Sequence, residues 1–287
     1  MASVADALRD ARGRLASHGD SPGLDAEWLL AHVLDWPRAR LRSHDDTELS
    51  PEQAATLEGL LQRRLTGEPI AYLTGWHGFR DLILKVGPGV LIPRPETEEL
   101  VDLALEQLGE QRDIRVLDIG TGSGAIALAI AHERPQWRVD ATEIDRDALA
   151  IARANITRLD LGQRVRLHEG PWLAEQTGPW ELVVSNPPYI PENDPHLERG
   201  DVAFEPRLAL ASGTDGLDAL RSLCRRVPPR LSPGGWLMVE HGFDQAEAVA
   251  RLFHAGGLEE VHSRSDLAGR LRFTLGRRPG SRGRDGA

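Results

Sequence analysis

The 287-residue sequence contains a single cysteine, Cys224, and no apolar run of the roughly 20 residues that a membrane-spanning helix needs. One cysteine excludes an intramolecular disulfide and a zinc site built from several thiolates, and it suits a reducing cytoplasm. The chain also lacks an excess of positive charge, since 34 basic residues are outnumbered by 44 acidic ones and the net charge is −10. A protein that holds nucleic acid mainly through its phosphates is normally basic, so the composition argues against a duplex-binding protein.

Two further signals are missing. The N-terminal stretch MASVADALRDARGRL carries charges throughout and lacks the apolar core of a secretory signal, so we expect a folded helix there. The ten histidines show no metal-ligand spacing, and no metal site is predicted.

Residues 1–68 are predicted to form a small N-terminal helical domain. In SPEQAATLEGLLQRRLTG, Ser50 is placed to cap a helix, Pro51 suits its first turn, and Gln53 completes a capping box. The apolar face of that helix consists of Leu57, Leu60, Leu61 and Leu65. The region has no catalytic grouping, so we expect a packing domain that docks the substrate.

The pattern changes after residue 68. Alternating residues around Gly75 and Gly78 predict a β-hairpin linker over 69–90. In 91–277, the stiff segment IPRPETE leads into a helix, after which strands and helices alternate. The predicted strands are IRVLDIG, WRVDATEID, RVRLHEG, ELVVSN, GGWLMVEHG and RLRFTLG. This alternation predicts an α/β domain with a mostly parallel sheet and helices on both faces. The arginine- and glycine-rich segment 278–287 is predicted to be a disordered tail.

A glycine-rich loop follows the first of these strands, in VLDIGTGSGAIALAI. Glycines there let the backbone turn sharply and let a ligand approach the main-chain amides. Glu143 ends the next strand about 20 residues later, where a carboxylate can accept hydrogen bonds from both ribose hydroxyls of a nucleoside. The dinucleotide pattern G-x-G-x-x-G would need glycine in place of Ala125, so the G-x-G-x-G spacing resembles instead the S-adenosylmethionine loop of Rossmann-like methyltransferases. The predicted loop residues are Gly120, Thr121, Gly122, Ser123 and Gly124.

The stretch ELVVSNPPYIP ends a valine-rich strand at Asn186, followed by Pro187, Pro188 and Tyr189. In an open parallel sheet the ligand crevice lies at such strand ends. Asn186 offers a side-chain carbonyl, and Pro187 offers a main-chain carbonyl whose direction Pro188 restricts. Two fixed acceptors match an NH₂ group of an amide or of an exocyclic base amine, and Tyr189 supplies a flat ring for a planar group.

An amide nitrogen is a poor nucleophile because its lone pair is delocalised into the carbonyl. Acceptors that hold both N–H bonds aim the nitrogen at a methyl carbon and favour the positive charge that grows on it. A sulfonium methyl donor is already activated, so no strong base is required. Asn186, Pro187 and Tyr189 are therefore the candidate catalytic residues.

Asn-Pro-Pro-Tyr after a methyltransferase loop resembles amino methyltransferases that act on planar nitrogens, which include adenine-N6 DNA enzymes and protein glutamine-N5 enzymes. Other motifs favour the second group. GEPIAYLTG, LIPRPETEELV, FEPRLAL and EHG resemble the peptide chain release factor N5-glutamine methyltransferases (HemK/PrmC family), over nearly the whole chain. The resemblance implies a Rossmann-like class I methyltransferase fold with a seven-stranded sheet, joined by the hairpin to the small helical domain.

The resemblance also implies S-adenosylmethionine as the methyl donor and S-adenosylhomocysteine as the product. The segment Gly120–Gly124, Glu143 and Asn186 would hold this cofactor, and Trp172 would pack near its adenine. Residues Asn186–Tyr189 would bind the glutamine of the Gly-Gly-Gln motif in class I release factors.

Two positions depart from the family pattern. The family usually has Asp in place of Glu143, and the longer side chain still reaches a ribose. It often has Asp where this chain has Pro171, which removes an acceptor for the adenine amino group and leaves Glu169 as an alternative.

Three other functions stay open: methylation of a ribosomal-protein glutamine, adenine-N6 methylation of nucleic acid, and a catalytically silent S-adenosylmethionine-binding module. The segment IPRPETE favours release factors, the negative charge and small helical domain disfavour an adenine substrate, and the intact Asn186 and Tyr189 disfavour a silent module. We expect a monomeric, cytoplasmic enzyme of translation termination that binds class I release factors and neither nucleic acid directly nor a membrane.

Overall fold

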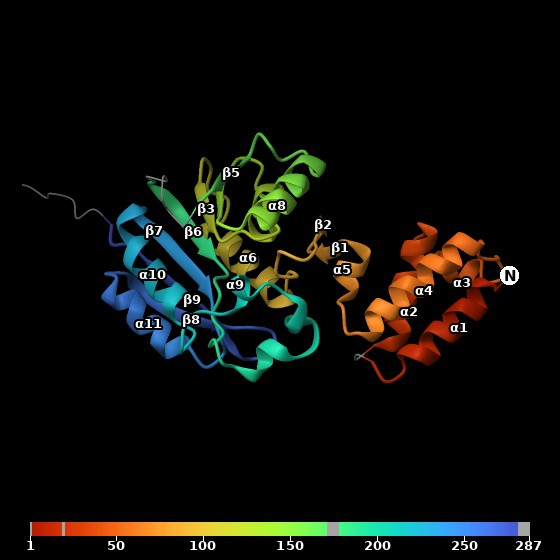
Figure 1. Ribbon diagram of the computed structural model, residues 1–287. Helices are drawn as coiled ribbons and strands as arrows, with labels where there is room; N and C mark the ends of the chain where they lie inside the picture. Colours follow the sequence, from red (N-terminus) through yellow and green to blue (C-terminus); the bar gives the residue numbers. More distant parts are fainter. Residues whose placement is uncertain (1, 19–20, 171–177, 281–287) are drawn as a thin grey trace, which may run out of the picture. The chain divides into compact units, whose positions relative to one another are not determined.

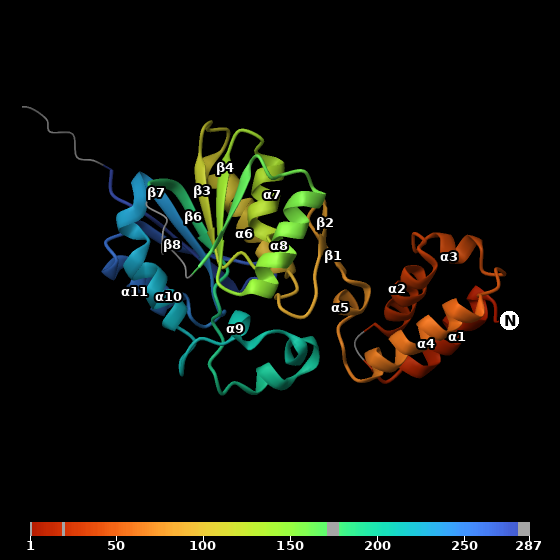
Figure 2. The same cartoon turned by 45° about the horizontal axis from the view of Figure 1, so that its top comes forward.

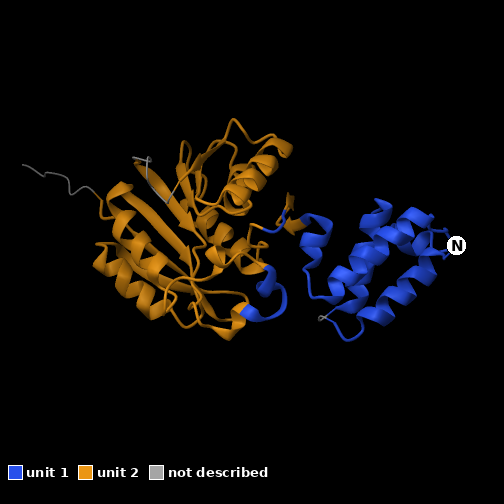
Figure 3. Cartoon of the chain, in the orientation of Figure 1, with its two compact units in different colours: residues 1–76, 86–88, 198–204 blue, residues 77–85, 89–197, 205–287 orange. Residues whose placement is uncertain are grey.

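The computed structural model describes residues 2–18, 21–170 and 178–280. The chain divides into two compact units (Figure 3). Unit 1 comprises residues 1–76, 86–88 and 198–204, and unit 2 comprises residues 77–85, 89–197 and 205–287. Within the described ranges, no helix is both long and apolar enough to cross a bilayer.

Unit 1 is helical. Its helices are α1 (Val4–Leu15), α2 (Pro22–Leu34), α3 (Arg40–Ser43), α4 (Pro51–Leu65) and α5 (Ile70–Thr74). Helix α1 confirms the predicted N-terminal helix. Helix α4 begins with the predicted capping box, because the Ser50 hydroxyl accepts from the Gln53 N–H and the Gln53 side chain accepts from the Ser50 N–H.

Leucine side chains fill the core of unit 1. Leu15, Leu29 and Leu30 of α1 and α2 are fully buried, and α4 buries Leu57, Leu60 and Leu61 against them while Leu65 lies partly buried. The predicted apolar face of α4 is therefore confirmed. Arg64, on the same helix, pairs with Asp25 of α2 at 2.9 Å and with Asp201 of the short helix η2 (Gly200–Phe204) at 3.3 Å.

Unit 2 is built on a seven-stranded sheet (Figure 1, Figure 2). The strands lie in the order β5 (Val165–Glu169), β4 (Arg138–Glu143), β3 (Arg115–Ile119), β6 (Trp180–Ser185), β7 (Leu231–Glu240), β9 (Leu271–Arg277) and β8 (Glu259–Ser265). The five strands β3, β4, β5, β6 and β7 are parallel to one another, and β9 is antiparallel to both of its neighbours, β7 and β8. The predicted mostly parallel seven-stranded sheet is confirmed.

Helices cover both faces of this sheet, as predicted (Figure 2). Successive side chains of a strand point to opposite faces, so Val116 and Leu182 enter one core while their neighbours Leu117 and Val183 enter another. The first core is completed by α6 (Pro95–Leu108), α7 (Ala125–Glu133) and α8 (Arg146–Arg158), and the second by α10 (Asp218–Arg226) and α11 (Ala246–Ala255).

The set of predicted strands did not include β8. This strand lies at the edge of the sheet and most of its side chains are exposed. Its sequence EEVHSRS therefore lacks the apolar alternation by which strands are recognised.

The predicted linker, 69–90, contains helix α5 and then the hairpin of β1 (Trp76–Phe79) and β2 (Leu82–Lys85). The turn falls at Arg80, whose φ is +51°, rather than at Gly75 or Gly78. Gly75 ends α5 instead, with φ +79°.

The order of the strands marks a ligand site. From β3 the chain moves outward to β4 and β5, and then returns to place β6 on the other side of β3. In open parallel sheets, ligands bind outside the carboxyl ends of the strands at such a reversal. The ends of β3 and β6 carry the glycine loop and Asn186.

Candidate active site

The glycine loop connects β3 to α7. Gly120, Gly122 and Gly124 have φ values of +70°, +57° and +89°, a region that favours glycine. A Cβ on Gly120 or Gly122 would meet no atom within 4 Å, whereas one on Gly124 would lie 2.9 Å from Leu128 Cδ1. Gly124 therefore serves the packing of the loop on α7, and the other two keep the space beside the loop open.

A buried carboxylate holds this loop to the sheet. Asp118, in β3, accepts through Oδ2 from Thr121 Oγ1 at 2.6 Å and from the Ala127 N–H at 3.1 Å. The residue is fully buried, and burial raises the pKa of its carboxyl to about 7. The two hydrogen bonds fix the loop and the first turn of α7 relative to β3.

Glu143 lies at the end of β4 and is nearly buried. Its Oε2 accepts from the Gly122 N–H at 2.8 Å, and its Oε1 accepts from the N–H groups of Ile144 and Asp145 at 2.7 and 2.9 Å. A carboxylate has about four lone-pair positions. Three are used by the main chain, so Oε2 keeps one acceptor position in a rigidly held group.

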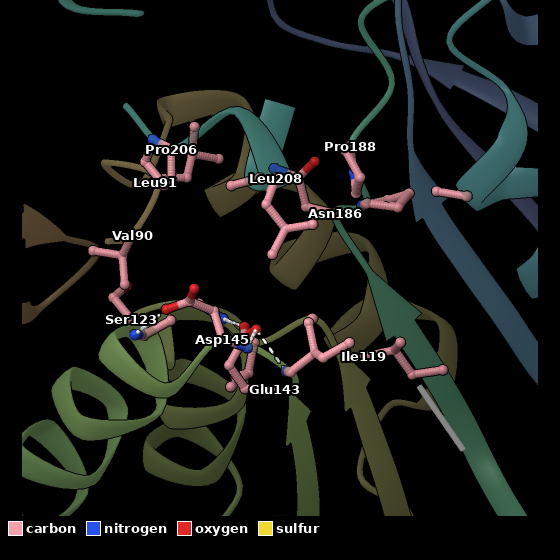
Figure 4. A pocket seen from close by; sticks show the side chains of 18 of the residues that line it. Val90, Leu91, Ile119, Ser123, Glu143, Asp145, Asn186, Pro188, Pro206 and Leu208 are labelled. Atoms are coloured by element: carbon pink, nitrogen blue, oxygen red, sulfur yellow. Dashed lines mark hydrogen bonds between the residues drawn. The ribbon is translucent and has the colours of Figure 1, made fainter. Parts of the chain in front are cut away.

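The loop and Glu143 line a cavity of about 420 Å³ (Figure 4), a size usual for small-molecule sites. Leu91, Pro206 and Leu208 lie across this cavity from Glu143 and Asp145 (Figure 4). The wall is mostly apolar, with a few polar groups such as Glu143 and Asn186. Among the residues that the structure describes, no three histidine, cysteine or carboxylate side chains gather as they would around a metal ion.

Asn186 follows β6 and lines the same cavity. Its Nδ2 donates to Thr97 Oγ1, in the first turn of α6, over 3.0 Å. Thr97 Oγ1 donates in turn to Glu240 Oε2, at the end of β7, over 2.8 Å. The Tyr189 hydroxyl donates to Glu240 Oε1 over 3.2 Å. Four side chains from three segments therefore form one hydrogen-bonded row.

The middle of this row is shielded from water, whereas Asn186 and Tyr189 at its ends are partly exposed. Thr97 and Glu240 are 4% and 1% exposed. Burial raises the pKa of Glu240 to about 7, although its two hydroxyl donors act in the opposite direction. Burial and the neighbouring carboxylate raise the pKa of Tyr189 well above its usual range, so this phenol keeps its proton at neutral pH.

The chain after the two prolines is anchored by hydrogen bonds. Ile190 donates its N–H to the Leu210 carbonyl and accepts from the Ser212 N–H, both over 2.9 Å. Gln245 Nε2 donates to the Tyr189 carbonyl over 3.0 Å. These bonds hold the Asn-Pro-Pro-Tyr segment in one conformation.

An ion pair joins two of the loops around the cavity. Arg94 Nη2 lies 2.5 Å from Glu205 Oε2, and the Glu205 side chain is fully buried. Pro93 and Pro206, next to these residues in sequence, both line the cavity. The pair therefore links the segments IPRPETE and FEPRLAL beside the site.

Most of the predicted site residues lie around this one cavity. Eight of the eleven line it, namely Gly120, Thr121, Gly122, Ser123, Glu143, Asn186, Pro187 and Pro188. Gly124 and Tyr189 are not among the described residues of its wall. Trp172 and the neighbouring Pro171 lie outside the described residues. The roles assigned to these residues stay predictions.

Sequence reasoning did not single out four residues that support the site: Thr97, Asp118, Asn155 and Glu240. Asn155 of α8 is fully buried and donates to the carbonyls of Ser123 and Lys85, which ties the glycine loop to β2. Asp118 and Glu240 are polar residues that follow apolar strand residues, in VLDI and LMVE. A buried polar group needs a partner, so that mismatch was the available signal.

Comparisons with known proteins agree with this architecture. Residues 6–75 match the family model for the PrmC N-terminal domain, and residues 97–200 match the methyltransferase small domain. The release factor glutamine methyltransferase of Xylella fastidiosa is 50% identical over 258 residues, which cover 90% of this chain and 94% of that protein. The Coxiella burnetii protein of the same name is 44% identical over 279 residues, covering 97% and 100%.

Solved structures share the fold. A methyltransferase from Pyrococcus furiosus has a TM-score of 0.54 and 20% identity, covering 77% of this chain and 99% of that one. A 16S rRNA methyltransferase from T. thermophilus, in complex with AdoMet and guanosine, has a TM-score of 0.52 and 16% identity, covering 71% and 49%. These likenesses show the class I methyltransferase fold alone, whereas the sequence matches extend over both units. The chain therefore belongs to the release factor glutamine methyltransferase family.

Proposed function

We propose that the chain transfers a methyl group from S-adenosylmethionine to the N5 side-chain amide of the glutamine in the Gly-Gly-Gln motif of class I release factors. The observation that carries this proposal is the position of Asn186. Its Nδ2 is occupied by Thr97 at the cavity wall, so its Oδ1 is left to accept from a substrate N–H. The choice of a release factor rests on the family to which the chain belongs.

The cavity residues fit S-adenosylmethionine. Glu143 Oε2 keeps an acceptor position for a ribose hydroxyl, and the apolar wall suits a flat base. The space beside Gly120 and Gly122, where a Cβ would meet no atom within 4 Å, leaves room for the amino acid part. When bound, the cofactor supplies a methyl group that is already activated by its cationic sulfur. We propose that Trp172 packs near the adenine.

The substrate amide would be held by two acceptors, Asn186 Oδ1 and the Pro187 carbonyl. Hydrogen bonds to both N–H groups fix the direction of the nitrogen and favour the positive charge that develops on it. The extra proton leaves through these acceptors to water. Pro188 and Tyr189 would bind the same glutamine, with the tyrosine ring against the planar amide.

The helical domain at residues 1–68 would dock the release factor, and residues 91–277 would carry out the transfer. We place the enzyme in the cytoplasm, as a monomer that acts on protein and contacts neither nucleic acid directly nor a membrane. The free thiol of Cys224 suits a reducing compartment. Burial raises the pKa of this thiol to about 12, so it stays protonated at neutral pH.

A methylation assay tests the proposal. The purified chain is incubated with labelled S-adenosylmethionine and a class I release factor, and the modified residue is located by mass spectrometry. We expect one methyl group on the Gly-Gly-Gln glutamine, and none on a release factor whose glutamine is replaced by glutamate. Label found only in ribosomal proteins or in adenine of added DNA, or in no acceptor, would overturn it.

A further inference from the structure

We propose that Thr97 and Glu240 are positioning residues, which orient the Asn186 side-chain amide so that its oxygen faces the substrate. The inference rests on the proposed function, because that reaction needs an acceptor from Asn186 and not a donor. It is carried by the row of hydrogen bonds from Asn186 through Thr97 to Glu240.

The direction of the hydrogen bonds decides the orientation. Above its pKa of about 7, Glu240 is ionised and only accepts hydrogen bonds, and a threonine hydroxyl has one proton to donate. The Thr97 proton is used by Glu240 Oε2 at 2.8 Å. Thr97 Oγ1 is therefore an acceptor toward Asn186, and the group that meets it must be the NH₂ end of the amide.

The reversed amide would be unfavourable at both ends. Asn186 Oδ1 would face a threonine oxygen whose proton is already donated, and Nδ2 would face the N–H groups of the substrate. A buried polar group without a partner keeps the full free-energy cost of its desolvation. Because Thr97 and Glu240 are almost completely buried, water does not compete for these positions.

Tyr189 completes the arrangement at the other carboxylate oxygen. Its hydroxyl donates to Glu240 Oε1 over 3.2 Å, so both oxygens of Glu240 act as acceptors. The partners come from α6, β7 and the segment after β6, and the sheet holds them together. The row therefore holds the Asn186 side-chain amide in one orientation relative to the sheet.

Two substitutions at Thr97 test this inference by kinetics, measured at about pH 8.5, where Glu240 is ionised. Thr97→Val removes the hydroxyl at nearly constant shape, and we expect kcat to fall about tenfold, equivalent to about 1.4 kcal/mol, while the Kd for S-adenosylmethionine stays within about twofold. Thr97→Ser keeps the hydroxyl and should restore most of kcat. The matched control is Thr274→Val, which removes a buried hydroxyl bonded to His241 and Ser263. It should retain kcat.

Two kinetic results would overturn the inference: an unchanged kcat in Thr97→Val, or an equal loss of kcat in Thr274→Val. A readout independent of turnover is the NMR signal of the Asn186 side-chain NH₂, assigned by its absence in Asn186→Ala. In the wild-type protein one of its protons should be protected from exchange, and Thr97→Val should abolish that protection. If the wild-type protein methylates no release factor, the proposed function fails, but the NMR signal still tests the orientation of the Asn186 amide. An unprotected NH₂ group in the wild-type protein would refute that orientation.

Discussion

Gly122 donates its main-chain N–H to Glu143 Oε2 over 2.8 Å, so one carboxylate ties the glycine loop to the end of β4. The other oxygen of Glu143 accepts from two N–H groups of the turn that follows. Hydrogen bonds to an ionised group are about twice as strong as neutral ones. Glu143 is therefore held in one orientation before any ligand binds. We expect this preorganised carboxylate to contribute to the affinity for S-adenosylmethionine.

We expect Glu143→Ala to raise the Kd for S-adenosylmethionine about 10- to 100-fold. The change removes a charged acceptor and loosens the loop, and hydrogen bonds to charged groups contribute about 1.5–3 kcal/mol. Calorimetric titration measures the affinity. Glu247→Ala, at an exposed carboxylate on α11, is the control and should bind normally. An unchanged affinity in Glu143→Ala would remove the ribose role.

Asn186→Ala should lower kcat by about 100- to 1000-fold, the loss typical for one preorganised hydrogen-bonding group at the reacting atoms. The fold should be largely spared, because Asn186 stands after β6 and outside the apolar cores. Methyl transfer to a release factor is followed by scintillation counting, with circular dichroism as the control for folding. Turnover near the wild-type rate would contradict the acceptor role.

The pair of Arg94 and Glu205 should stabilise unit 2. Arg94→Met leaves a fully buried carboxylate without its guanidinium partner, and breaking a buried ion pair costs about 3 kcal/mol or more. Adding Glu205→Gln to this variant removes the buried charge and should recover part of the loss. Urea denaturation measures both free energies of unfolding. If the double variant is no more stable than Arg94→Met, the buried charge is not the cause.

Two glycine substitutions should have opposite effects on stability. Gly124→Ala places a methyl group 2.9 Å from Leu128 Cδ1 at a φ of +89°, so we expect a loss of about 2 kcal/mol. Gly13→Ala lies inside α1 with no atom within 4 Å of the new Cβ, and we expect a gain of about 0.5–1 kcal/mol. Differential scanning calorimetry compares their Tm values. A stabilised Gly124→Ala variant would show that the loop tolerates a side chain.

Glu240 should make the free energy of unfolding fall as pH rises. Burial raises its pKa from 4.5 to about 7, so between these values the folded state binds more protons than the unfolded state. The stabilisation that follows from the raised pKa is complete below about pH 4.5 and is lost as pH rises through about 7. Glu240→Gln removes this titration, and its stability should decline less between pH 5 and pH 7.5.

Urea denaturation at several pH values measures this difference. Glu96 and Arg272 act on the pKa of Glu240 itself, so their influence is part of the predicted titration. Burial lowers the pKa of His241 and raises that of Asp118, and both residues are present in both proteins, so their own titrations cancel when the slopes are compared. Equal slopes in the wild-type protein and Glu240→Gln would mean that Glu240 does not titrate in this range.

Local spacing along the chain was enough to predict the local parts of the fold and of the site. The alternation of strands and helices, the three-glycine loop, the acid one strand later and Asn186 after β6 were all recognisable, because each depends on spacing along the chain. Backbone geometry links neighbouring residues, so a pattern of a few residues is enough to predict a capping box such as Ser50–Gln53 or the carboxyl end of a strand.

The contacts between groups that are distant in sequence could be read only from the folded chain. Thr97 lies 143 residues from Glu240 in sequence, and Arg94 lies 111 residues from Glu205, yet each pair forms a hydrogen bond. No spacing rule predicts such contacts, because they depend on the order of strands in the sheet. The exposed edge strand β8 was not predicted for a related reason. It is a strand because it pairs with β9, and its own sequence has no apolar alternation.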